Sequence, residues 1–368
     1  MAGIYIHIPF CKKRCIYCGF YSTIRTDLRQ RYVNAVCGEM ELRSEETVNE
    51  ESIETIYLGG GTPSLLNGEQ LQQIFSHLAR MYSLSSKIEV TLEVNPDDIT
   101  APYAAMLTRL PINRISMGAQ TFNDERLRFL HRRHTATQIS QAVQMLRDAG
   151  IRNISIDLMY GFPDETIDDW QQDIDQALTL DVEHISAYCL MIEEDTPLWR
   201  MGIGPIDEEV ERQMYELLID KLTEAGYEHY EISNFARSDY RSKHNSNYWN
   251  DVPYIGLGAA AHSYDGICRR WNVSDILQYT EAIEQGKLPY EQEILDDDTR
   301  YNDRITVALR TSNGLDLSTL SEKHRNHCLK EARKFLDHKL LRQENDRLIL
   351  TRKGLFISDM VMSELMIV

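Results

Sequence analysis

The sequence alternates between short runs rich in β-branched residues and longer segments with the spacing of amphipathic helices. The six runs are Ile4–Ile8, Thr55–Leu58, Lys87–Val94, Arg114–Met117, Asn153–Met159 and His184–Leu190. Strands that alternate with helices predict a parallel sheet with right-handed crossovers. Six units are too few to close an eight-stranded barrel, so we predict an α/β fold with a partial, splayed (β/α)6 barrel.

The rest of the chain differs in pattern, and we expect residues 1–230 to form the barrel core, residues 231–290 an extension of it, and residues 291–368 a C-terminal domain. In the core we predict a first helix at Asp27–Glu46, and a strand at Tyr227–Phe235 leads into the extension. In the C-terminal domain we predict helices at Asn302–Thr311, Leu317–Lys339 and from Arg352, and a hairpin around Glu344–Asp346. Helices followed by a two-stranded wing predict a mostly helical, winged-helix-like domain. Its charges are mixed rather than basic, which argues against a DNA-binding role.

Charge and hydropathy exclude several classes of protein. The formal net charge is -18, which argues against general affinity for nucleic acid or for anionic lipid. Seven cysteines, an odd number, fit a reducing cytosol better than a disulfide framework. Strand-like sequence begins within three residues of Met1, and the chain contains no run of 18 apolar residues, so we expect neither a signal peptide nor a membrane span.

Three of these cysteines, Cys11, Cys15 and Cys18, lie in the stretch CKKRCIYCGF directly after the first predicted strand. Their spacing allows the thiolates to converge on one metal centre. Four cysteines would complete a structural zinc site or a four-iron cluster, whereas three leave one iron of a cubane [4Fe-4S] cluster free to take a ligand. The alternatives are three unconnected buried cysteines, or a zinc site completed by His7.

Further candidate ligand-binding groups follow other predicted strands. Gly59–Gly61 and Thr62 come after the second strand, where a backbone without side chains lets its N–H and C=O groups approach a ligand closely. An ordinary structural turn is the alternative. Glu93 ends the third strand, where a carboxylate points into the mouth of a barrel. Asp157 lies among apolar residues, so we expect it to be paired or functional.

Together these motifs resemble a known family. The matching stretches are YIHIPFCKKRCIYCGFYS, TIYLGGGTPSLL, LEVNPDD, NRISMGAQTF, SIDLMYGFPDET and HISAYCL. In this order, over nearly the whole chain, they resemble the oxygen-independent coproporphyrinogen III oxidase family of radical S-adenosylmethionine (SAM) proteins. The resemblance implies that Cys11, Cys15 and Cys18 bind a [4Fe-4S] cluster whose open iron chelates SAM. It also implies that the SAM-contacting positions are Tyr5, Tyr17, Gly60, Gly61, Thr62, Glu93, Gln120, Arg132 and Asp157.

The family has two branches, and two features distinguish them here. The oxidase branch carries a further cysteine two residues after the third, and this position is Phe20. The stretch HNSNYW, residues 244–249, matches the HNxxYW motif associated with heme in the HemW-type chaperone branch. An imidazole can ligate heme iron and aromatic neighbours can stack on the macrocycle, which assigns His244, Asn245, Tyr248 and Trp249 to heme. A structural His-Asn turn beside core aromatics is the alternative.

The resemblance therefore implies a cytoplasmic heme chaperone that binds a [4Fe-4S] cluster, SAM and heme. Its expected partners are heme-accepting apoproteins, membrane-bound respiratory enzymes among them, which would bring it to the membrane periphery; a homodimer is left open. The alternative is an enzyme, a coproporphyrinogen III dehydrogenase, and Phe20 argues against that activity. A regulator acting through the winged module ranks behind both. His262 as a second heme ligand is a further alternative, although a lone histidine is more often structural.

Overall fold

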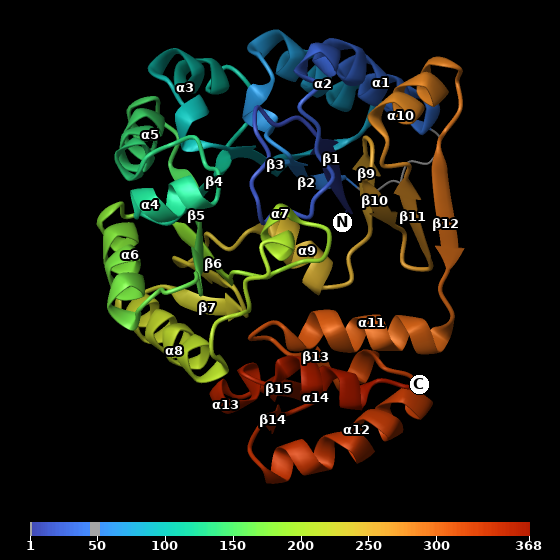
Figure 1. Ribbon diagram of the computed structural model, residues 1–368. Coiled ribbons are helices and arrows are strands. Elements are labelled where there is room, and N and C mark those ends of the chain that lie inside the picture. The colour runs from blue at the N-terminus through green and yellow to red at the C-terminus, as the bar shows by residue number, and fades with distance from the viewer. Residues whose placement is uncertain (1, 45–51) are drawn as a thin grey trace.

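Six parallel strands form the centre of the molecule, as predicted. The computed structural model describes residues 2–44 and 52–368, and Figure 1 shows the strands arranged in an arc with helices outside it. The strands are β1 (Ala2–Ile8), β2 (Ile53–Gly60), β3 (Leu84–Val94), β4 (Arg114–Gln120), β5 (Asn153–Tyr160) and β6 (His184–Cys189). They lie in sequence order, and each is parallel to the next. The predicted partial (β/α)6 barrel is confirmed.

Amphipathic helices cover the outer face of this sheet and bury their apolar sides on it. They are α1 (Arg29–Leu42), α2 (Gly68–Met81), α3 (Ala101–Leu107), α4 (Asp124–Phe129), α5 (Ala136–Asp148), α6 (Ile167–Thr179) and α8 (Glu208–Glu224). Helix α2 illustrates the local cause, because Asn67 and Gln70 form a capping box at its start. The predicted first helix extended to Glu46, and its last two residues lie outside the described part of the chain.

Further strands extend the sheet at both edges. On one side β9 (Tyr254–Leu257) runs parallel to β1 and is followed by β10 (His262–Tyr264), β11 (Cys268–Asn272) and β12 (Tyr290–Ile294), with α10 (Ile276–Glu284) between the last two. On the other side β8 (Asn234–Ala236) pairs with β6, and β7 (Glu228–Glu231) pairs with β8. The described strands leave the barrel open, because β12 and β7 end the sheet without meeting.

The prediction of one strand at Tyr227–Phe235 is wrong. The chain reverses at Ile232–Ser233, so Glu231 pairs with Asn234 and two short antiparallel strands result. The Glu231 carboxylate accepts hydrogen bonds from the backbone N–H of Ser233 and from Asn234 Nδ2. A buried acidic side chain thus stabilises a turn that alternation of residue type does not reveal.

The C-terminal part has its own sheet and its own hydrophobic core. Its elements are α11 (Asp297–Leu309), β13 (Leu315–Asp316), α12 (Glu322–Asp337), β14 (Leu341–Glu344), β15 (Arg347–Leu350), α13 (Arg352–Leu355) and α14 (Ser358–Leu365). Ile305, Phe335 and Leu348 are among the residues of a buried cluster separate from that of the barrel. The mostly helical character and the hairpin are confirmed, while the limits of the domains stay a prediction.

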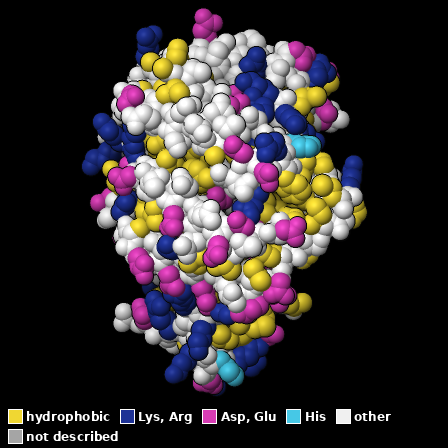
Figure 2. Space-filling model, turned by 60° about the vertical axis from the view of Figure 1, so that its left-hand side comes forward, with side chains coloured by type: hydrophobic (Ala, Val, Ile, Leu, Met, Phe, Trp, Pro, Cys, Tyr) yellow, Lys and Arg dark blue, Asp and Glu magenta, His cyan; other side chains and the backbone are white. Residues whose placement is uncertain are grey.

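All three predicted helices of this part have different limits. The helix predicted at Asn302–Thr311 is α11, which begins earlier, at Asp297, because the Asp296 side chain accepts a hydrogen bond from the Thr299 N–H and so caps it. The helix predicted from Leu317 starts only at Glu322, because the Ser321 side chain accepts a hydrogen bond from the His324 N–H and so caps α12. The helix predicted from Arg352 is interrupted near Phe356 and forms α13 and α14. Figure 2 shows acidic and basic side chains interspersed over the lower, C-terminal part of the molecule on the face in view.

The C-terminal part contacts the barrel through α11, which lies below α9 (Lys243–Trp249) in Figure 1. Arg310 pairs with the buried carboxylate of Glu231 at 3.0 Å, and Arg304 pairs with Asp251 at 2.8 Å. Each helix within residues 2–44 and 52–368 is too short or too polar to cross a membrane.

Candidate functional site

The cysteine loop begins at the carboxyl end of β1 and is fixed there by backbone hydrogen bonds. The Cys11 N–H donates to the Thr23 carbonyl at 2.9 Å, and the Thr23 N–H donates to the Pro9 carbonyl at 2.6 Å. Cys11, Cys15 and Cys18 are half-buried and their thiols are free. The loop therefore presents its sulfurs at the edge of the parallel sheet where ligands bind.

Two side chains from other strands donate hydrogen bonds to these sulfurs. Thr62 Oγ1 donates to Cys11 Sγ and Arg132 Nη1 donates to Cys15 Sγ, each at 3.6 Å. Burial, together with the smaller effects of the neighbouring Cys15 and Cys11, raises the pKa of the Cys18 thiol to about 11. Such thiols give up their protons to a bound cation, and N–H and O–H donors to sulfur are typical of iron–sulfur sites.

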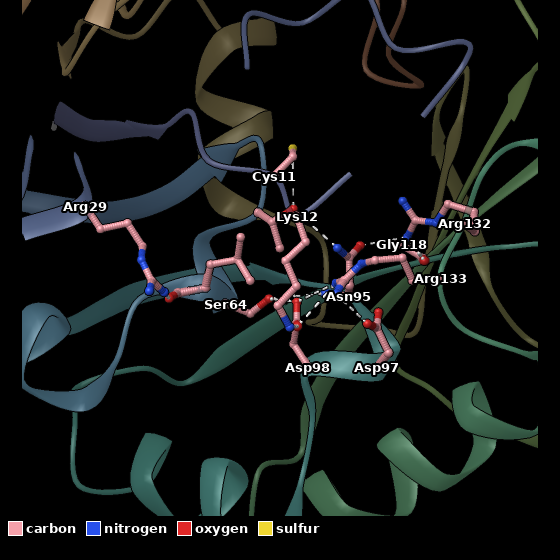
Figure 3. A network of polar contacts seen from close by, with 12 residues as sticks. Cys11, Lys12, Arg29, Ser64, Asn95, Asp97, Asp98, Gly118, Arg132 and Arg133 are labelled. Atoms are coloured by element: carbon pink, nitrogen blue, oxygen red, sulfur yellow. Dashed lines mark hydrogen bonds and ion pairs between the residues drawn. The ribbon is translucent and has the colours of Figure 1, made fainter. Parts of the chain in front are cut away.

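Arg132 also contacts the ends of two strands, as Figure 3 shows. Its Nη2 donates to Asn95 Oδ1, after β3, at 2.8 Å and to the Gly118 carbonyl of β4. A Cβ on Gly118 would lie 2.8 Å from Arg132 Nη2, so this position needs a glycine. Gln120, at the end of β4, is buried with a φ of 69°, and the turn it makes leads into the segment before α4. Arg132 thus lies at the cysteine loop and Gln120 at the carboxyl end of β4, while their contact with SAM stays a prediction.

A second polar network ties the cysteine loop to the segment after β3. Asp98, whose side chain is almost fully buried, accepts from Lys12 Nζ at 2.8 Å, from Ser64 Oγ at 2.9 Å and from Arg133 Nη2 at 3.2 Å. Arg133 also pairs with Asp97 at 2.8 Å. Figure 3 shows these side chains converging beneath the loop. Asp98 is therefore the common acceptor that anchors Lys12, within the cysteine loop, to the sheet.

The glycine run at the end of β2 packs tightly against the cysteine loop. Gly60 has a φ of +109°, and a Cβ there would lie 2.5 Å from the His7 ring. A Cβ on Gly61 would lie 2.8 Å from the Phe10 carbonyl oxygen. Side chains at these positions would push β2 away from β1, so the glycines have a structural role whether or not their N–H groups also face a ligand.

Glu93 and Asp157 both face the interior of the barrel. Glu93 accepts hydrogen bonds from the Tyr57 hydroxyl at 2.8 Å and from the Gly60 N–H at 3.0 Å, and burial raises its pKa to about 7. Asp157 accepts from Ser116 Oγ at 3.4 Å, and burial raises its pKa to about 6. A carboxyl group whose pKa lies near 7 is partly protonated at neutral pH, so it can accept or donate hydrogen bonds. This property suits the binding of hydroxyl groups.

The two predicted tyrosines occupy different places. Tyr17 lies beside Cys15 and Arg132, and burial raises the pKa of its hydroxyl. Tyr5 lies deeper in the barrel: its ring stacks near Tyr57 at 6.2 Å and near His244 at 6.4 Å between centroids. Tyr5 therefore adjoins the histidine of the HNSNYW stretch, while Tyr17 belongs to the cysteine loop.

The HNSNYW stretch forms α9, which closes the amino end of the barrel. His244 is 1% exposed, with Nδ1 at 2.9 Å from Thr55 Oγ1 and Nε2 at 2.9 Å from the Tyr248 hydroxyl. Burial and, to a smaller extent, the nearby Arg114 guanidinium lower the pKa of His244 to about 3, so the ring is neutral. A Cβ on Gly3, the second residue of β1, would lie 3.3 Å from this ring, so a glycine there leaves room for His244.

The other predicted heme residues are not gathered around His244. The Asn245 N–H donates to the Ser242 side chain that caps α9. Trp249 lies under the Arg310 guanidinium, at 5.0 Å from its ring centroid, at the boundary with the C-terminal part. His262 stacks on Trp271 in the β10–β11 ribbon at 6.2 Å. Only Tyr248 among them contacts the His244 ring.

The two predicted sites lie at opposite ends of one barrel. Thr55, which contacts His244, stands near the start of β2, and Gly60 stands at its end beside the cysteine loop. Gly60 lies five residues further along the extended strand than Thr55, a distance of roughly 16 Å. The interior between them holds the buried polar side chains of Tyr57, Glu93 and Asp157.

Comparison with known proteins identifies the family. The radical SAM superfamily model matches residues 5–177, and the HemN C-terminal domain model matches residues 295–357. A protein of Bacillus subtilis named heme chaperone HemW is 35% identical over 88% of this chain and 87% of its own length. One from Lactococcus lactis with the same name is 32% identical over 99% of this chain and 97% of its own. The chain belongs to the HemW family.

The fold agrees with a solved structure outside the HemW family. Coproporphyrinogen III oxidase (HemN) of Escherichia coli, a radical SAM enzyme, matches with a TM-score of 0.85 and 22% identity over 99% of this chain and 89% of that one. The match of this chain to the radical SAM superfamily model implies a [4Fe-4S] cluster and SAM. The donors to Cys11 and Cys15 and the half-buried thiols fit such a cluster.

Several residues that shape these sites were missed in the sequence. Asn95 and Asp98 lie in the quoted stretch LEVNPDD, yet their contacts with Arg132 and Lys12 join segments far apart in the chain. Arg114 begins the stretch RISM, and its burial inside the barrel was not predicted. A charged side chain at an inward position of a predicted strand is the signal that points to it.

Proposed function

We propose that this protein is a heme chaperone that holds a [4Fe-4S] cluster and SAM at the cysteine loop and binds heme at α9. The names of its relatives support heme binding, and the observation that carries the proposal is the position of α9. The HNSNYW stretch forms the floor of the same barrel whose other end carries the complete cysteine loop. The buried polar side chains of Tyr57, Glu93 and Asp157 lie between the two ends.

At the cysteine loop, Cys11, Cys15 and Cys18 would hold the cluster, which when bound supplies an open iron and an electron. Thr62 and Arg132 orient the first two sulfurs and stabilise negative charge on them. Glu93, fixed by Tyr57 and Gly60, presents a carboxyl group to hydroxyl groups of SAM. Tyr17, Gln120 and Asp157 complete the proposed SAM set with Gly60 and Gly61, and Tyr5 lies toward α9.

At α9, the neutral His244 is the residue that would hold the heme iron. Neutral imidazole is the form that binds iron, and burial keeps it in that form. Its Nε2 is engaged by the Tyr248 hydroxyl, so ligation requires this hydrogen bond to be given up. Tyr248, Asn245 and Trp249 would then line the bound heme, with Trp249 at the boundary with the C-terminal part. Delivery to heme-requiring respiratory apoproteins, including ones at the membrane, is the proposed role.

The second candidate is a coproporphyrinogen III dehydrogenase, which the complete cysteine loop favours. Phe20 stands where the oxidase branch has a further cysteine, and it is 71% exposed. An exposed phenyl ring there supplies neither a thiol nor a proton, which favours the chaperone.

Anaerobic reconstitution with iron and sulfide, followed by parallel assays, separates the two functions. We expect heme to bind to the reconstituted protein and His244→Ala to weaken that binding while the cluster absorbance stays. We expect no consumption of coproporphyrinogen III with SAM and a reductant. Turnover of the porphyrinogen would establish the dehydrogenase instead, and heme affinity that is unchanged in His244→Ala would remove the assignment of α9.

A further inference from the structure

Arg114 is a buried cation whose hydrogen-bond donors are left open. It begins β4, faces the barrel interior and is 1% exposed. Within residues 2–44 and 52–368, its Nε and Nη1 atoms are buried and have no hydrogen-bond partner. A buried charge without partners costs several kcal/mol, so proteins retain one where a ligand or ordered water completes it.

Thr91 provides a second open group at the same place. It is the residue of β3 that pairs with Arg114 across the sheet, it is fully buried, and its Oγ1 lacks a partner among the described residues. Two adjacent, inward-facing side chains thus present a guanidinium fork and a hydroxyl to the same part of the interior. The pair offers several N–H donors and one O–H donor, which is the complement of a carboxylate.

The interior carboxyl groups of the barrel do not fill this role. Glu93 is bound to Tyr57 and to the Gly60 N–H, and Asp157 is bound to Ser116. Glu89, the buried carboxylate of β3 nearest the amino end, accepts from the His244 N–H at 3.1 Å. Glu93 and Asp157 act on Arg114 only through space, and neither is within hydrogen-bonding distance of it. The Arg114 donors therefore face something that the described chain does not supply.

The position of Arg114 assigns it to the α9 end of the barrel. Arg114 and Gln120 begin and end β4, so roughly 20 Å of strand separates Arg114 from the end that carries the cysteine loop. Its charge is close enough to lower the pKa values of both His244 and His184, which line the amino end of the barrel. A carboxylate bound to Arg114 would thus lie beside the proposed heme ligand and away from the cluster.

We propose that Arg114 and Thr91 form a carboxylate-binding site at the amino end of the barrel, and that it takes a propionate of the heme held at α9. This assignment rests on the proposed function. Heme carries two propionates, and a guanidinium fork binds a carboxylate through two parallel hydrogen bonds. The methionyl carboxylate of SAM is the other source of the same chemistry, and the experiment distinguishes the two.

The test compares hemin with hemin dimethyl ester, in which both carboxylates are blocked, on the reconstituted full-length protein. We expect the wild type to bind hemin about 10- to 100-fold more tightly than the ester, as for a charge-assisted hydrogen-bonded pair. Arg114→Gln should remove this preference, because it should lower the affinity for hemin and leave the affinity for the ester unchanged. Arg126→Gln is the matched control, since Arg126 is a largely buried arginine paired with Glu165 and Asp169 on the outer side of the barrel.

Each other outcome overturns the assignment in a recognisable way. Equal affinity of the wild type for hemin and the ester would exclude a propionate contact. An equal loss on both ligands in Arg114→Gln would give Arg114 a structural role only. Weaker SAM binding with unchanged hemin binding in this variant, measured by equilibrium dialysis, would make SAM the occupant. A wild type that binds neither form of heme would remove the proposed function together with this assignment.

A variant that fails to fold leaves the test intact. The ester comparison needs only the wild type, and Thr91→Val keeps the shape of the side chain while removing its hydroxyl. We expect Thr91→Val to lower the affinity for hemin about 2- to 5-fold and to leave the affinity for the ester unchanged. An equal effect on both ligands would exclude Thr91 from the site.

Discussion

The two ends of the barrel differ in how far their functional groups are already engaged. At the cysteine loop the three thiols are half-buried and free, and the side chains around them donate toward sulfur. At α9 the His244 ring is buried, and both of its nitrogens are within hydrogen-bonding distance of a hydroxyl. Within residues 2–44 and 52–368, no three His, Cys, Asp or Glu side chains stand close enough together to hold a metal ion, so the first end must bring its free thiols together on a cluster. The second end must exchange internal hydrogen bonds for a ligand.

Their electrostatics differ in the same sense. Burial holds Glu93, near the cysteine loop, partly protonated at neutral pH, with a pKa of about 7. Burial holds His244 unprotonated, with a pKa of about 3. Both groups avoid charge in the low-dielectric interior, but by opposite proton movements. Protonation of His244 in acid should therefore destabilise the fold at the α9 end, and ionisation of Glu93 in base should destabilise it at the other end.

The largest expected effect comes from Cys15→Ala. We expect complete loss of the absorbance near 400 nm that an iron–sulfur cluster gives after reconstitution, since the loop has no spare ligand. Heme titration of the same variant checks the separation of the two ends, and its affinity should change by less than about twofold, because distant sites act independently. A cluster that persists in Cys15→Ala would show that the cysteines are wrongly assigned as its ligands. A loss of heme affinity in the same variant would show that the two ends are coupled.

The next effect concerns acid stability. The folded-state pKa of His244, about 3, lies below its ordinary value of 6.5, so its contribution to stability is present above pH 6.5 and is lost as the pH falls. Between pH 6.5 and pH 5 the wild type should lose about 1.5 kcal/mol more of its free energy of unfolding than His244→Gln does. Urea titrations at both pH values measure the difference. Parallel losses in the two proteins would show that His244 titrates normally.

Asp98→Asn should have a comparable effect at the other end. Removing the charge of a buried acceptor for Lys12, Ser64 and Arg133 should lower the free energy of unfolding by about 2 kcal/mol. Looser anchoring of the loop should also speed the loss of iron to a chelator. The exposed Asp27, paired with Arg25, provides the control, and Asp27→Asn should change neither measurement. Equal iron release in all three proteins would argue against an anchoring role.

Tyr248→Phe should have the smallest effect, and in the opposite direction. It frees His244 Nε2 from its hydrogen bond, so we expect heme affinity to rise about 2- to 10-fold. Tyr290→Phe, on the exposed strand β12, is the control. Weaker heme binding in Tyr248→Phe would instead show that the Tyr248 hydroxyl contacts the bound heme.

Much of this protein could be predicted from the sequence by itself, because the features concerned are local. The alternation of strands and helices determined the partial barrel, and the spacing of Cys11, Cys15 and Cys18 determined the cysteine loop. The glycine run and Glu93 were found because each directly follows or ends a strand, and carboxyl ends of parallel strands meet at one edge. Errors arose where a single side chain decides a boundary, as Glu231 does in the turn between β7 and β8.

Only the tertiary structure decided how distant segments meet. It placed α9 at the amino end of the barrel, opposite the cysteine loop, and it buried His244 under Thr55 and Tyr248. It also set Arg114 beside Thr91 with its donors open. Periodicity and motif spacing describe neighbours along the chain. Burial, hydrogen-bond partners and pKa values depend on neighbours in space, and for these residues the neighbours come from elements far away in the sequence.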